Sequence, residues 1–458
     1  MREWEQATWS AGRTEEQVIR KVGEIVAAKA LQLTDAGDRV LVLTGKGHNG
    51  DDARAALGGL SARQVELLPV TRPEASLAEL SRRLDPPPQL VVDGLFGIGL
   101  NRELSDSWIQ LIRVLNASCA RVLAVDVPSG LNAETGEPMP EAVRAAVTLT
   151  LGAPKLGFLS PTAWSCLGRL EVAPDIGLAA QRPAGDVLFS ETHDFCSYPP
   201  PRLAHAHKGD YGHLAIVAGS LGYHGAAVLA ARGAMGAKPG LITVFPQEEV
   251  YGPVAGQLAA PMVRPWSGAD WHSAEYSAIL LGPGLAQARI RTNLKPVVAE
   301  LWQTFPGPVM VDASGLDWIP AGATASSGWR AVTPHPGEAA RMLGCKTAEV
   351  QTNRLASLRQ ISRTYGNCWV VLKGYQTMIG RLTGTVYVNG SGNPGLAQGG
   401  SGDVLAGYLA GLLAQPALAR DPSFLIRFAV WQHGHAADSL ARESQGWSAE
   451  DLAQAIGR

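Results

Sequence analysis

Short apolar runs recur along the first two hundred residues, and helical patterns separate some of them. The runs contain few polar positions, as is typical of strands that are buried on both faces. They cover residues 39–44, 90–93, 122–127, 147–151 and 170–173. Helical patterns occupy 14–33, 53–60 and 105–115. The alternation predicts a largely parallel sheet with helices on both of its faces.

The same alternation of apolar runs and helical patterns returns after residue 205. The expected strands are 213–218, 241–245, 278–281, 309–312, 331–333 and 369–372, followed by a hairpin that joins 377–381 to 385–389. The expected helices are 225–236, 403–415 and 424–442. Between the two blocks lies Tyr198-Pro-Pro-Pro-Arg202, whose prolines cannot continue a helix or a central strand. We therefore predict two α/β domains, 1–197 and 198–458.

The helical pattern at 403–415 begins at a turn that is crowded with glycine, Asn393-Pro-Gly-Leu-Ala-Gln-Gly-Gly-Ser-Gly-Asp403. The amides at the start of this helix would point at whatever occupies the turn, and bare glycines let a polyanion approach the backbone. Asp403, at the edge of that anion site, is placed to remove a proton from a hydroxyl that attacks phosphorus. The pattern indicates a phosphoryl-transfer site.

A glycine-rich turn alone would more simply be a place where the chain reverses, so its neighbours decide the interpretation. Lys373-Gly-Tyr-Gln-Thr377 follows an expected strand, and its Lys and Thr can both reach phosphate oxygens. Thr333-Pro-His-Pro-Gly-Glu338 and Gly282-Pro-Gly284 also follow apolar runs. Polar turns at several strand ends are where an open α/β sheet forms its ligand crevice.

The first block has three comparable strand-end turns. They are Gly45-Lys-Gly-His-Asn-Gly-Asp-Asp52, Asp93-Gly-Leu-Phe-Gly-Ile-Gly-Leu-Asn-Arg102 and Asp126-Val-Pro-Ser-Gly-Leu131. The first of them places backbone amides where a dinucleotide phosphate can sit. Its motif alone is weak, but three acidic or glycine-rich strand ends in one sheet favour a site.

Two residues in or near these turns, Asp126 and Lys155, each allow two interpretations. Asp126 is either a cap at a strand end or a catalytic acid/base. Lys155 is either a surface lysine or a proton donor to the same crevice. Asn49, Asp93 and Ser129 can together surround a monovalent cation, because such an ion needs hard oxygen ligands.

Composition and charge exclude several classes of function. The net charge is −2 and no block of basic residues is present, so nucleic acid is not an expected partner. No apolar run approaches the roughly 20 residues that a bilayer span requires. The polar start of the chain lacks a signal-peptide core, which favours a cytoplasmic location. The five cysteines are scattered and form no CxxC pair, so we expect incidental thiols.

Over nearly the whole chain these motifs resemble the bifunctional NAD(P)H-hydrate repair enzymes, in which an NAD(P)HX epimerase is fused to an ADP-dependent NAD(P)HX dehydratase. In the first half the resemblance rests on residues 45–52, 93–102, 126–130 and 154–155. In the second it rests on residues 208–213, 282–284, 333–338, 373–377, 393–403 and 433–434. It implies a Rossmann-like domain over 1–197 and a ribokinase-like domain over 198–458.

For the second domain the resemblance implies a substrate that carries an extra hydroxyl on its reduced nicotinamide ring. Asp403 would deprotonate that hydroxyl, and the amides of residues 399–402 would stabilise the transferring phosphoryl group. The implied nucleotide-binding residues are Lys373, Gly374, Tyr375, Gln376, Thr377, Gly399, Gly400, Ser401 and Gly402. The implied hydrate-binding residues are Ala226, Gly284, His335 and Asp403. ADP is the expected donor, assisted by Mg²⁺.

For the first domain the resemblance implies interconversion of the R and S hydrates. Potassium would be bound by Asn49, Asp93 and Ser129, and Asp126 with Lys155 would shuttle the proton. The implied hydrate contacts are His48, Asn49, Gly50, Asp51, Asp52, Gly97, Gly99, Arg102 and Asp126. The family usually has Asn-Asn-Gly-Gly-Asp-Gly where this chain has residues 48–53, so Asp51 is expected to direct a carboxylate toward the phosphate site.

Two alternatives remain open at this stage. The second domain can be an ordinary small-molecule kinase of the ribokinase type, which would leave a stable phosphate ester. The first domain can be a binding module without catalysis. We also expect a homo-oligomer. His433 and His435, within an apolar helical pattern, are expected to be core residues rather than metal ligands, and His205, His207 and His213 to lie in a linker and at a strand start.

Overall fold

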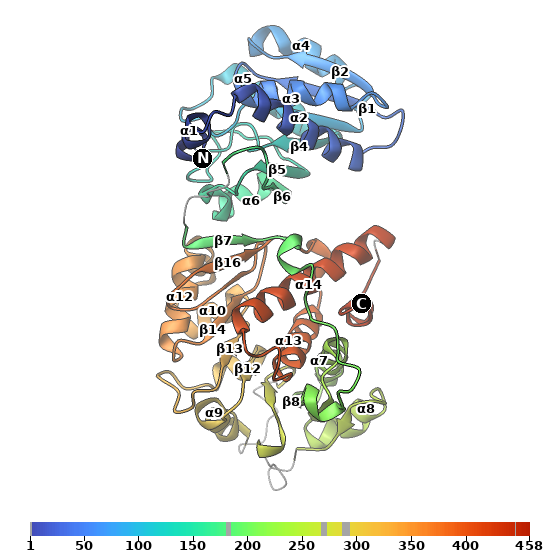
Figure 1. The fold of residues 1–458 in the computed structure, drawn as a ribbon, viewed down its shortest axis with the longest axis vertical. Helices are drawn as coiled ribbons and strands as arrows, with labels where there is room; N and C mark the ends of the chain where they lie inside the picture. The colour runs from blue at the N-terminus through green and yellow to red at the C-terminus, as the bar shows by residue number, and fades with distance from the viewer. Residues whose placement is uncertain (1, 180–184, 267–272, 286–293, 445) are drawn as a thin grey trace. The chain divides into compact units, whose positions relative to one another are not determined.

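The computed structural model describes residues 2–179, 185–266, 273–285, 294–444 and 446–458. The chain divides into two compact units, Met1–Ala184 and Gly185–Arg458 (Figure 1). The boundary expected from the prolines, 197/198, lies inside the second unit. The reason is β7 (Val187–Ser190), which pairs in parallel with β16 (Val386–Asn389) of the second unit's sheet before the prolines are reached.

The first unit is built on a six-stranded sheet in the order β2-β1-β3-β4-β5-β6. All neighbouring strands run parallel, as predicted. The strands are β1 (Arg39–Thr44), β2 (Gln64–Pro69), β3 (Leu90–Gly94), β4 (Arg121–Val125), β5 (Val147–Leu151) and β6 (Arg169–Ala173). The sequence reasoning missed β2, an edge strand that is only partly buried and lacks a continuous apolar run.

Helices cover both faces of this sheet. Val40 and Val42 of β1 belong to one apolar core with α2 and α3, and Leu41 and Leu43 belong to another with α4 and α5. The helices are α1 (Arg2–Ser10), α2 (Glu15–Gln32), α3 (His48–Ala55), η1 (Ala56–Gly59), α4 (Pro73–Arg83), α5 (Asp106–Ala117), η2 (Leu156–Leu159) and α6 (Pro161–Leu167). Because α3 begins at His48, the expected turn at 48–52 is in fact the first turn of a helix.

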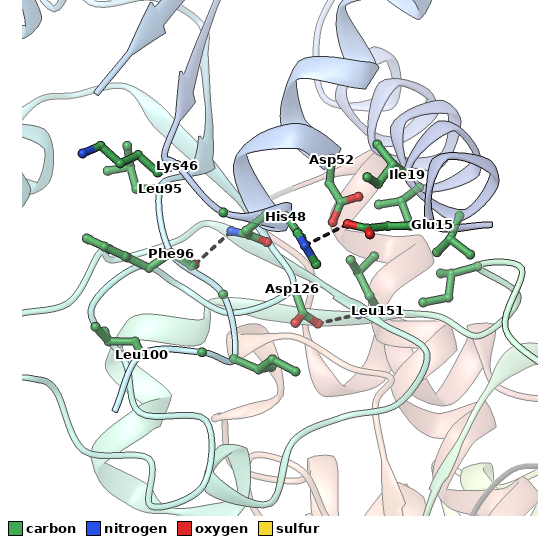
Figure 2. A pocket seen from close by; sticks show the side chains of 18 of the residues that line it. Glu15, Ile19, Lys46, His48, Asp52, Leu95, Phe96, Leu100, Asp126 and Leu151 are labelled. Atoms are coloured by element: carbon green, nitrogen blue, oxygen red, sulfur yellow. Dashed lines mark hydrogen bonds and ion pairs between the residues drawn. The ribbon is translucent and has the colours of Figure 1, made fainter. Parts of the chain in front are cut away.

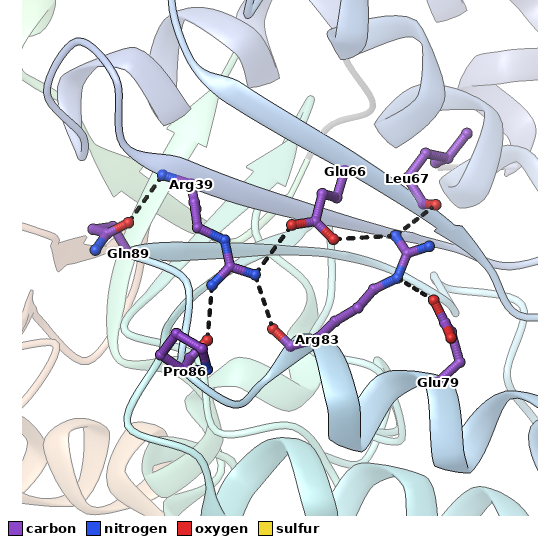
Figure 3. Close-up of polar contacts among 7 residues, drawn as sticks. All are labelled: Arg39, Glu66, Leu67, Glu79, Arg83, Pro86 and Gln89. Carbon is purple, nitrogen blue, oxygen red and sulfur yellow. Dashed lines mark hydrogen bonds and ion pairs between the residues drawn. The ribbon is translucent and has the colours of Figure 1, made fainter.

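A polar network holds the edge strand β2 against its neighbours (Figure 3). Glu66 of β2 accepts from Arg39 of β1 at 3.0 Å and pairs with Arg83 of α4 at 3.5 Å. Arg83 also donates to Glu79 at 2.7 Å and to the carbonyl of Leu67 at 3.1 Å. The network joins α4, β1 and β2 at one end of the sheet.

The second unit contains a ten-stranded sheet in the order β10-β9-β8-β11-β12-β13-β14-β15-β16-β7. Neighbours from β10 to β14 are parallel, and the expected hairpin is present as the antiparallel pair β15–β16. The remaining strands are β8 (His213–Val217), β9 (Leu241–Phe245), β10 (Met262–Val263), β11 (Ala278–Leu281), β12 (Val309–Val311), β13 (Arg330–Val332), β14 (Trp369–Leu372) and β15 (Met378–Gly380).

The main helices of this unit are α7 (His224–Ala237), α8 (Tyr251–Ala255), α9 (Leu294–Thr304), α10 (Pro336–Leu343), α11 (Thr347–Thr352), α12 (Arg354–Thr364), α13 (Ser401–Leu413), α14 (Pro422–Glu443) and α15 (Ala449–Ala455). Three of them, α7, α13 and α14, lie within two residues of their predicted bounds, and the others were not predicted. In the described part of the chain, none of the helices combines the length and apolarity that crossing a membrane requires. All five cysteines are free thiols.

The helix α13 is buried from Val404 to Leu413, as its apolar pattern predicts, and it packs very closely on α7. A Cβ atom built on Gly407 would lie 1.8 Å from the carbonyl oxygen of Ala230. One built on Gly233 of α7 would lie 2.3 Å from the carbonyl oxygen of Val404. The two backbones can therefore meet only because these positions are glycine, and this contact fixes where α13 begins.

Candidate active sites in the two units

The glycine-rich turn of the second unit, which ends at Gly400, leads directly into the N-terminus of α13. Gly400, at φ +94°, precedes the helix without a side-chain cap, and the amide of Val404 bonds to its carbonyl at 3.1 Å. The preceding amides of the first turn have no partner within the helix and suit an anion. Ser401 Oγ donates to the carbonyls of Leu396 at 2.7 Å and Gln398 at 3.1 Å, which fixes the turn.

His433 supports the same turn from α14. Its Nε2 lies 3.0 Å from the carbonyl oxygen of Ser401, and burial lowers the pKa of its imidazole to about 4. The ring is therefore neutral at physiological pH and donates from Nε2 to that carbonyl. His433 is a satisfied core residue, as expected, and its contact ties α14 to the first turn of α13.

Four ionisable side chains gather beside this helix start: Asp312, Glu338, Lys373 and Asp403. The Lys373 Nζ lies 2.8 Å from Asp312 Oδ1 and 3.9 Å from Glu338 Oε2. A Cβ built on Gly402 would lie 3.4 Å from the same nitrogen. Burial acts to lower the pKa of Lys373, but Asp312 and Glu338 oppose it and the net shift is upward, so the ammonium stays charged.

The carboxyl of Asp403 has the properties of a general base. Burial raises its pKa to about 7, and the negative charges of Asp312 and Glu338 act in the same direction, against the opposing effect of Lys373. A base is most effective when its pKa lies near the working pH. Asp403 thus combines a pKa suited to a general base with a position in the first turn of α13, whose amides suit an anion.

The turn at 373–377 lies next to the segment that carries Glu338. The amide of Lys373 donates to the carbonyl of Pro334 at 2.9 Å, and Thr377 Oγ1 donates to the carbonyl of Gly374 at 2.9 Å. His335 caps α10, where its Nδ1 accepts from the amide of Glu338 at 3.3 Å, and the Glu338 carboxylate in turn accepts from the His335 amide at 2.8 Å. The structure therefore brings His335 and the 373–377 turn to the same cluster.

The two small residues predicted to contact the hydrate are neighbours. A Cβ built on Gly284, at φ +65°, would lie 2.8 Å from Ala226 Cβ. One built on Gly282 would lie 1.9 Å from the carbonyl oxygen of Asp312. The 282–284 loop thus packs against both α7 and the segment that holds Asp312.

The first unit contains a cavity of about 520 Å³ at the carboxyl ends of its strands (Figure 2). Seven of the predicted residues line it: His48, Asn49, Asp52, Gly97, Gly99, Arg102 and Asp126. Gly50 and Asp51 do not: Gly50 packs against Gly45, and Asp51 pairs with Arg54 at 3.4 Å. The Asp51 carboxylate, expected to point toward a phosphate, is occupied on the surface of α3 instead.

Asp126 presents its carboxyl to this cavity in a strained backbone conformation, at φ +64°. Its Oδ1 accepts from the amide of Leu151 at 2.9 Å and lies 2.6 Å from Lys155 Nζ. Lys155 is buried and also donates to Thr150 Oγ1 at 3.0 Å and to the Leu151 carbonyl at 2.9 Å. Lys155 is therefore no surface lysine; it contacts Asp126 and is not among the residues that line the cavity.

Asn49 and Ser129 contact the backbone of Phe96, and Asp93 contacts Ser129. Asp93 is fully buried and accepts from Ser129 Oγ at 2.6 Å and from the Ser129 amide at 2.9 Å. The Phe96 amide donates to Ser129 Oγ at 2.8 Å, and Asn49 Nδ2 donates to the Phe96 carbonyl at 2.9 Å. Burial raises the pKa of Asp93. Several oxygen atoms thus gather around a deeply buried carboxyl group.

The sequence reasoning did not single out several residues of the two sites. Asp312 and Glu338 lay within quoted segments, and the rule that strand ends carry ligand contacts would have selected Asp312. In the first unit Glu15 Oε1 lies 2.8 Å from His48 Nε2 at the cavity wall (Figure 2). No local pattern connects α2 with this wall, so only the tertiary structure shows Glu15 there.

Comparison with known proteins covers both units. A family described as NAD(P)H-hydrate dehydratase matches residues 214–458, and one described as YjeF-related protein N-terminus matches residues 62–157. The bifunctional NAD(P)H-hydrate repair enzyme Nnr of Gloeobacter violaceus is 36% identical, over 98% of this chain and 94% of that protein. The Nnr of Coxiella burnetii is 31% identical, over 99% and 96%.

Solved structures resemble the second unit. An ADP/ATP-dependent NAD(P)H-hydrate dehydratase of Bacillus subtilis, co-crystallised with ATP and Mg²⁺, is 32% identical with a TM-score of 0.51, covering 56% of this chain and 91% of that one. A ribokinase-like superfamily protein of Enterococcus faecalis, 22% identical over 61% of this chain and 97% of its own, has a TM-score of 0.53. The expected ribokinase-like fold is thereby confirmed.

Proposed function

The chain belongs to the family of bifunctional NAD(P)H-hydrate repair enzymes, and from this membership we propose that its two units carry out successive steps on one damaged cofactor. The first unit interconverts R- and S-NAD(P)HX, and the second converts S-NAD(P)HX to NAD(P)H with ADP as the phosphoryl donor. The observation that carries the proposal is the half-buried carboxyl of Asp403, whose pKa is raised to about 7, beside Lys373 and the open amides of α13.

In the second unit Asp403 takes the proton of the ring hydroxyl, and the hydroxyl oxygen attacks the β-phosphorus of ADP. The bond to the bridging oxygen breaks and AMP leaves. The amides of residues 399–402 and the Lys373 ammonium stabilise the charge on the transferring phosphoryl group. The carbon–oxygen bond of the phosphorylated ring then breaks, phosphate departs, and loss of a proton from the neighbouring carbon restores the reduced nicotinamide.

We assign the nucleotide to residues 373–377 and 399–402, and the hydrate to Ala226, Gly284, His335 and Asp403. Mg²⁺ is usually held by nucleotide phosphates together with one or two carboxylates, and Asp312 and Glu338 beside Lys373 fit that donor set. When bound, the ion neutralises charge on the phosphates. The Bacillus subtilis relative is ADP/ATP-dependent and was co-crystallised with ATP and Mg²⁺, which supports an adenine nucleotide here.

In the first unit the hydrate occupies the 520 Å³ cavity, and Asp126 with Lys155 behind it moves the proton that inversion at the hydroxyl-bearing carbon requires. Potassium fits the oxygen atoms of Asn49, Asp93 and Ser129, because a monovalent cation would compensate the buried Asp93 carboxylate. Such an ion would neutralise charge and order the loop at the cavity wall. Assembly into a homo-oligomer is a further part of the proposal, and light scattering tests it.

The proposal is tested with purified protein, S-NADHX, ADP and Mg²⁺. We expect the absorbance of reduced nicotinamide to return with release of one phosphate and one AMP for each hydrate consumed. A stable phosphate ester of the hydrate, without recovery of absorbance, would assign the second unit to the small-molecule kinases instead. Failure with both ADP and ATP would contradict the repair function.

A further inference from the structure

Arg354, the first residue of α12, reaches the 373–377 turn from behind. The residue is 3% exposed. Its Nη2 donates to the carbonyls of Leu372 at 3.0 Å and Lys373 at 3.3 Å, and its Nη1 donates to the carbonyl of Tyr375. Burial lowers the pKa of Arg354 to about 10, so the guanidinium keeps its charge and all its donors at neutral pH. One guanidinium thus donates to the last carbonyl of β14 and to two carbonyls of the turn that follows it.

These contacts set the direction of the amides in the turn. Every peptide bond here is trans, so each N–H points opposite to the carbonyl of the same peptide group. Because the carbonyls of Lys373 and Tyr375 face the guanidinium, the amides of Gly374 and Gln376 face away from it. Both residues adopt left-handed backbone conformations, at φ +126° and +53°, which such a turn requires.

Two further carbonyls of the turn are also bonded: that of Gly374 accepts from Thr377 Oγ1 at 2.9 Å, and that of Thr377 accepts from the amide of Asn389 at 2.9 Å. The carbonyls of Lys373 and Tyr375 are therefore bonded to the guanidinium, and the amides of Gly374 and Gln376 point away from it. Backbone amides arranged in this way form a concave surface that binds anions. The Lys373 side chain, whose Nζ approaches Gly402 of α13, adds a positive charge near this surface.

We propose that Arg354 is a positioning residue for the nucleotide: its guanidinium holds the 373–377 turn so that the turn's amides face the phosphates of ADP. The proposal rests on the proposed nucleotide-binding function of that turn. Arg354 does not itself contact the nucleotide. Its planar fork of five donors is what allows several carbonyls to be held at fixed angles, and the three donors of a lysine ammonium cannot reproduce this geometry.

The test compares Arg354→Lys with Arg330→Lys as a matched control. Arg330 is also buried, at 4% exposure, also has a pKa lowered to about 10, and also donates to backbone carbonyls, those of Gly307 at 3.0 Å and Phe305 at 2.7 Å. It lies at the start of β13, away from the 373–377 turn. Binding of ADP with Mg²⁺ is measured by titration calorimetry, and kcat and both KM values are measured during dehydration.

We expect Arg354→Lys to raise the Kd and the KM for ADP by about tenfold or more, because charged hydrogen bonds that hold the turn are lost. The kcat at saturating ADP and the KM for the hydrate are expected to stay within about twofold, since Asp403 and its surroundings are unchanged. Arg330→Lys should lower the melting temperature without changing the Kd. Equal effects of the two variants on the Kd, or an unchanged Kd in Arg354→Lys, would overturn the proposal.

A second variant decides the question where Arg354→Lys does not fold. In Gly374→Ala the new Cβ has room, at 3.6 Å from Arg354 Nη2, but a φ of +126° is strained for alanine, so the backbone of the turn is expected to rotate and its amides to lose their direction. We expect the same selective loss of ADP affinity, and an unchanged Kd would again overturn the proposal. A wild-type protein that binds ADP but fails to dehydrate the hydrate would contradict the proposed function and leave the role of Arg354 standing.

Discussion

Each unit has a candidate catalytic aspartate, Asp403 at the start of α13 and Asp126 at the end of β4, and the surroundings of the two carboxyl groups differ. Asp403 stands beside two further carboxylates and one lysine, and burial with these charges holds its pKa at about 7. Asp126 has one buried lysine 2.6 Å behind it and lines an open cavity with many apolar walls. Phosphoryl transfer to a hydroxyl needs a base whose pKa lies near the working pH, next to fixed hydrogen-bond donors for the phosphate, whereas inversion at a ring carbon needs room for the ring. Each environment suits the reaction proposed for its unit.

The units also differ in how closely they follow their relatives. The dehydratase family matches the second unit from residue 214 to the end of the chain, whereas the match to the first unit begins at residue 62. The start of α3, with His48 and Asp51, lies before that match. The structure shows what the departure does: Asp51 pairs with Arg54, and His48 pairs with Glu15. The cavity keeps Asn49 and Asp52 on its wall.

The sharpest way to separate the units is Asp403→Asn. Loss of the base should reduce dehydration of S-NADHX by about 10³-fold, within the range expected for a general base. Binding of ADP and epimerisation in the first unit should stay within a few-fold of wild type. Absorbance of reduced nicotinamide measures dehydration, and calorimetry measures the binding of ADP. Asp421→Asn, at the cap of α14, serves as the control. If Asp403→Asn keeps a tenth or more of the wild-type dehydration rate, Asp403 is not the general base.

The matching change in the first unit is Asp126→Asn. We expect epimerisation to fall by about 10²-fold or more while dehydration of S-NADHX is unchanged. Asp51→Asn is the control, because the Asp51 side chain lies in the same unit but does not line the cavity. Chromatographic separation of the R and S forms measures the rate. Equal effects of Asp126→Asn and Asp51→Asn would show that the first unit only binds its ligand.

A third variant tests whether the two units unfold independently of one another. In Gly407→Ala the methyl group would meet the Ala230 carbonyl, so α13 must move away from α7 at a cost of about 2 kcal/mol in the unfolding free energy. Calorimetric unfolding should show the transition of the second unit alone shifted downward. Gly225→Ala in α7 is the control, because nothing lies within 4 Å of the added Cβ. A shift of both transitions would contradict independent stability of the units.

The smallest effect is a pH dependence confined to the second unit. The folded-state pKa of Asp403 is raised to about 7, and the base must be ionised to act. The kcat/KM of dehydration should therefore level off above about pH 7 and fall about tenfold for each unit of pH below it. Asp403→Asn should abolish this dependence. A profile that stays flat down to pH 5 would contradict the environment described for Asp403.

Much of this arrangement could be read from the sequence, because it depends on local patterns. Continuous apolar runs gave β1, β5, β9, β11 and β14 their observed bounds. The start of α3 was placed five residues late, since His48, Asn49 and Gly50 are weak helix formers and read as a turn. Tertiary contacts account for the rest. The burial of Lys155 behind Asp126, and the pairing of Asp312 with Lys373, join positions far apart in the chain.

The measurement that tests the two-site account most directly is an epimer-resolved time course with the wild-type protein. An R and S mixture of NADHX is incubated with ADP and Mg²⁺, and both forms and NADH are separated at intervals. The account predicts that the S form disappears first, and that the R form follows faster than its spontaneous epimerisation. Consumption of the R form only at the spontaneous rate would contradict it and would leave the cavity around Asp126 as a binding site without catalysis.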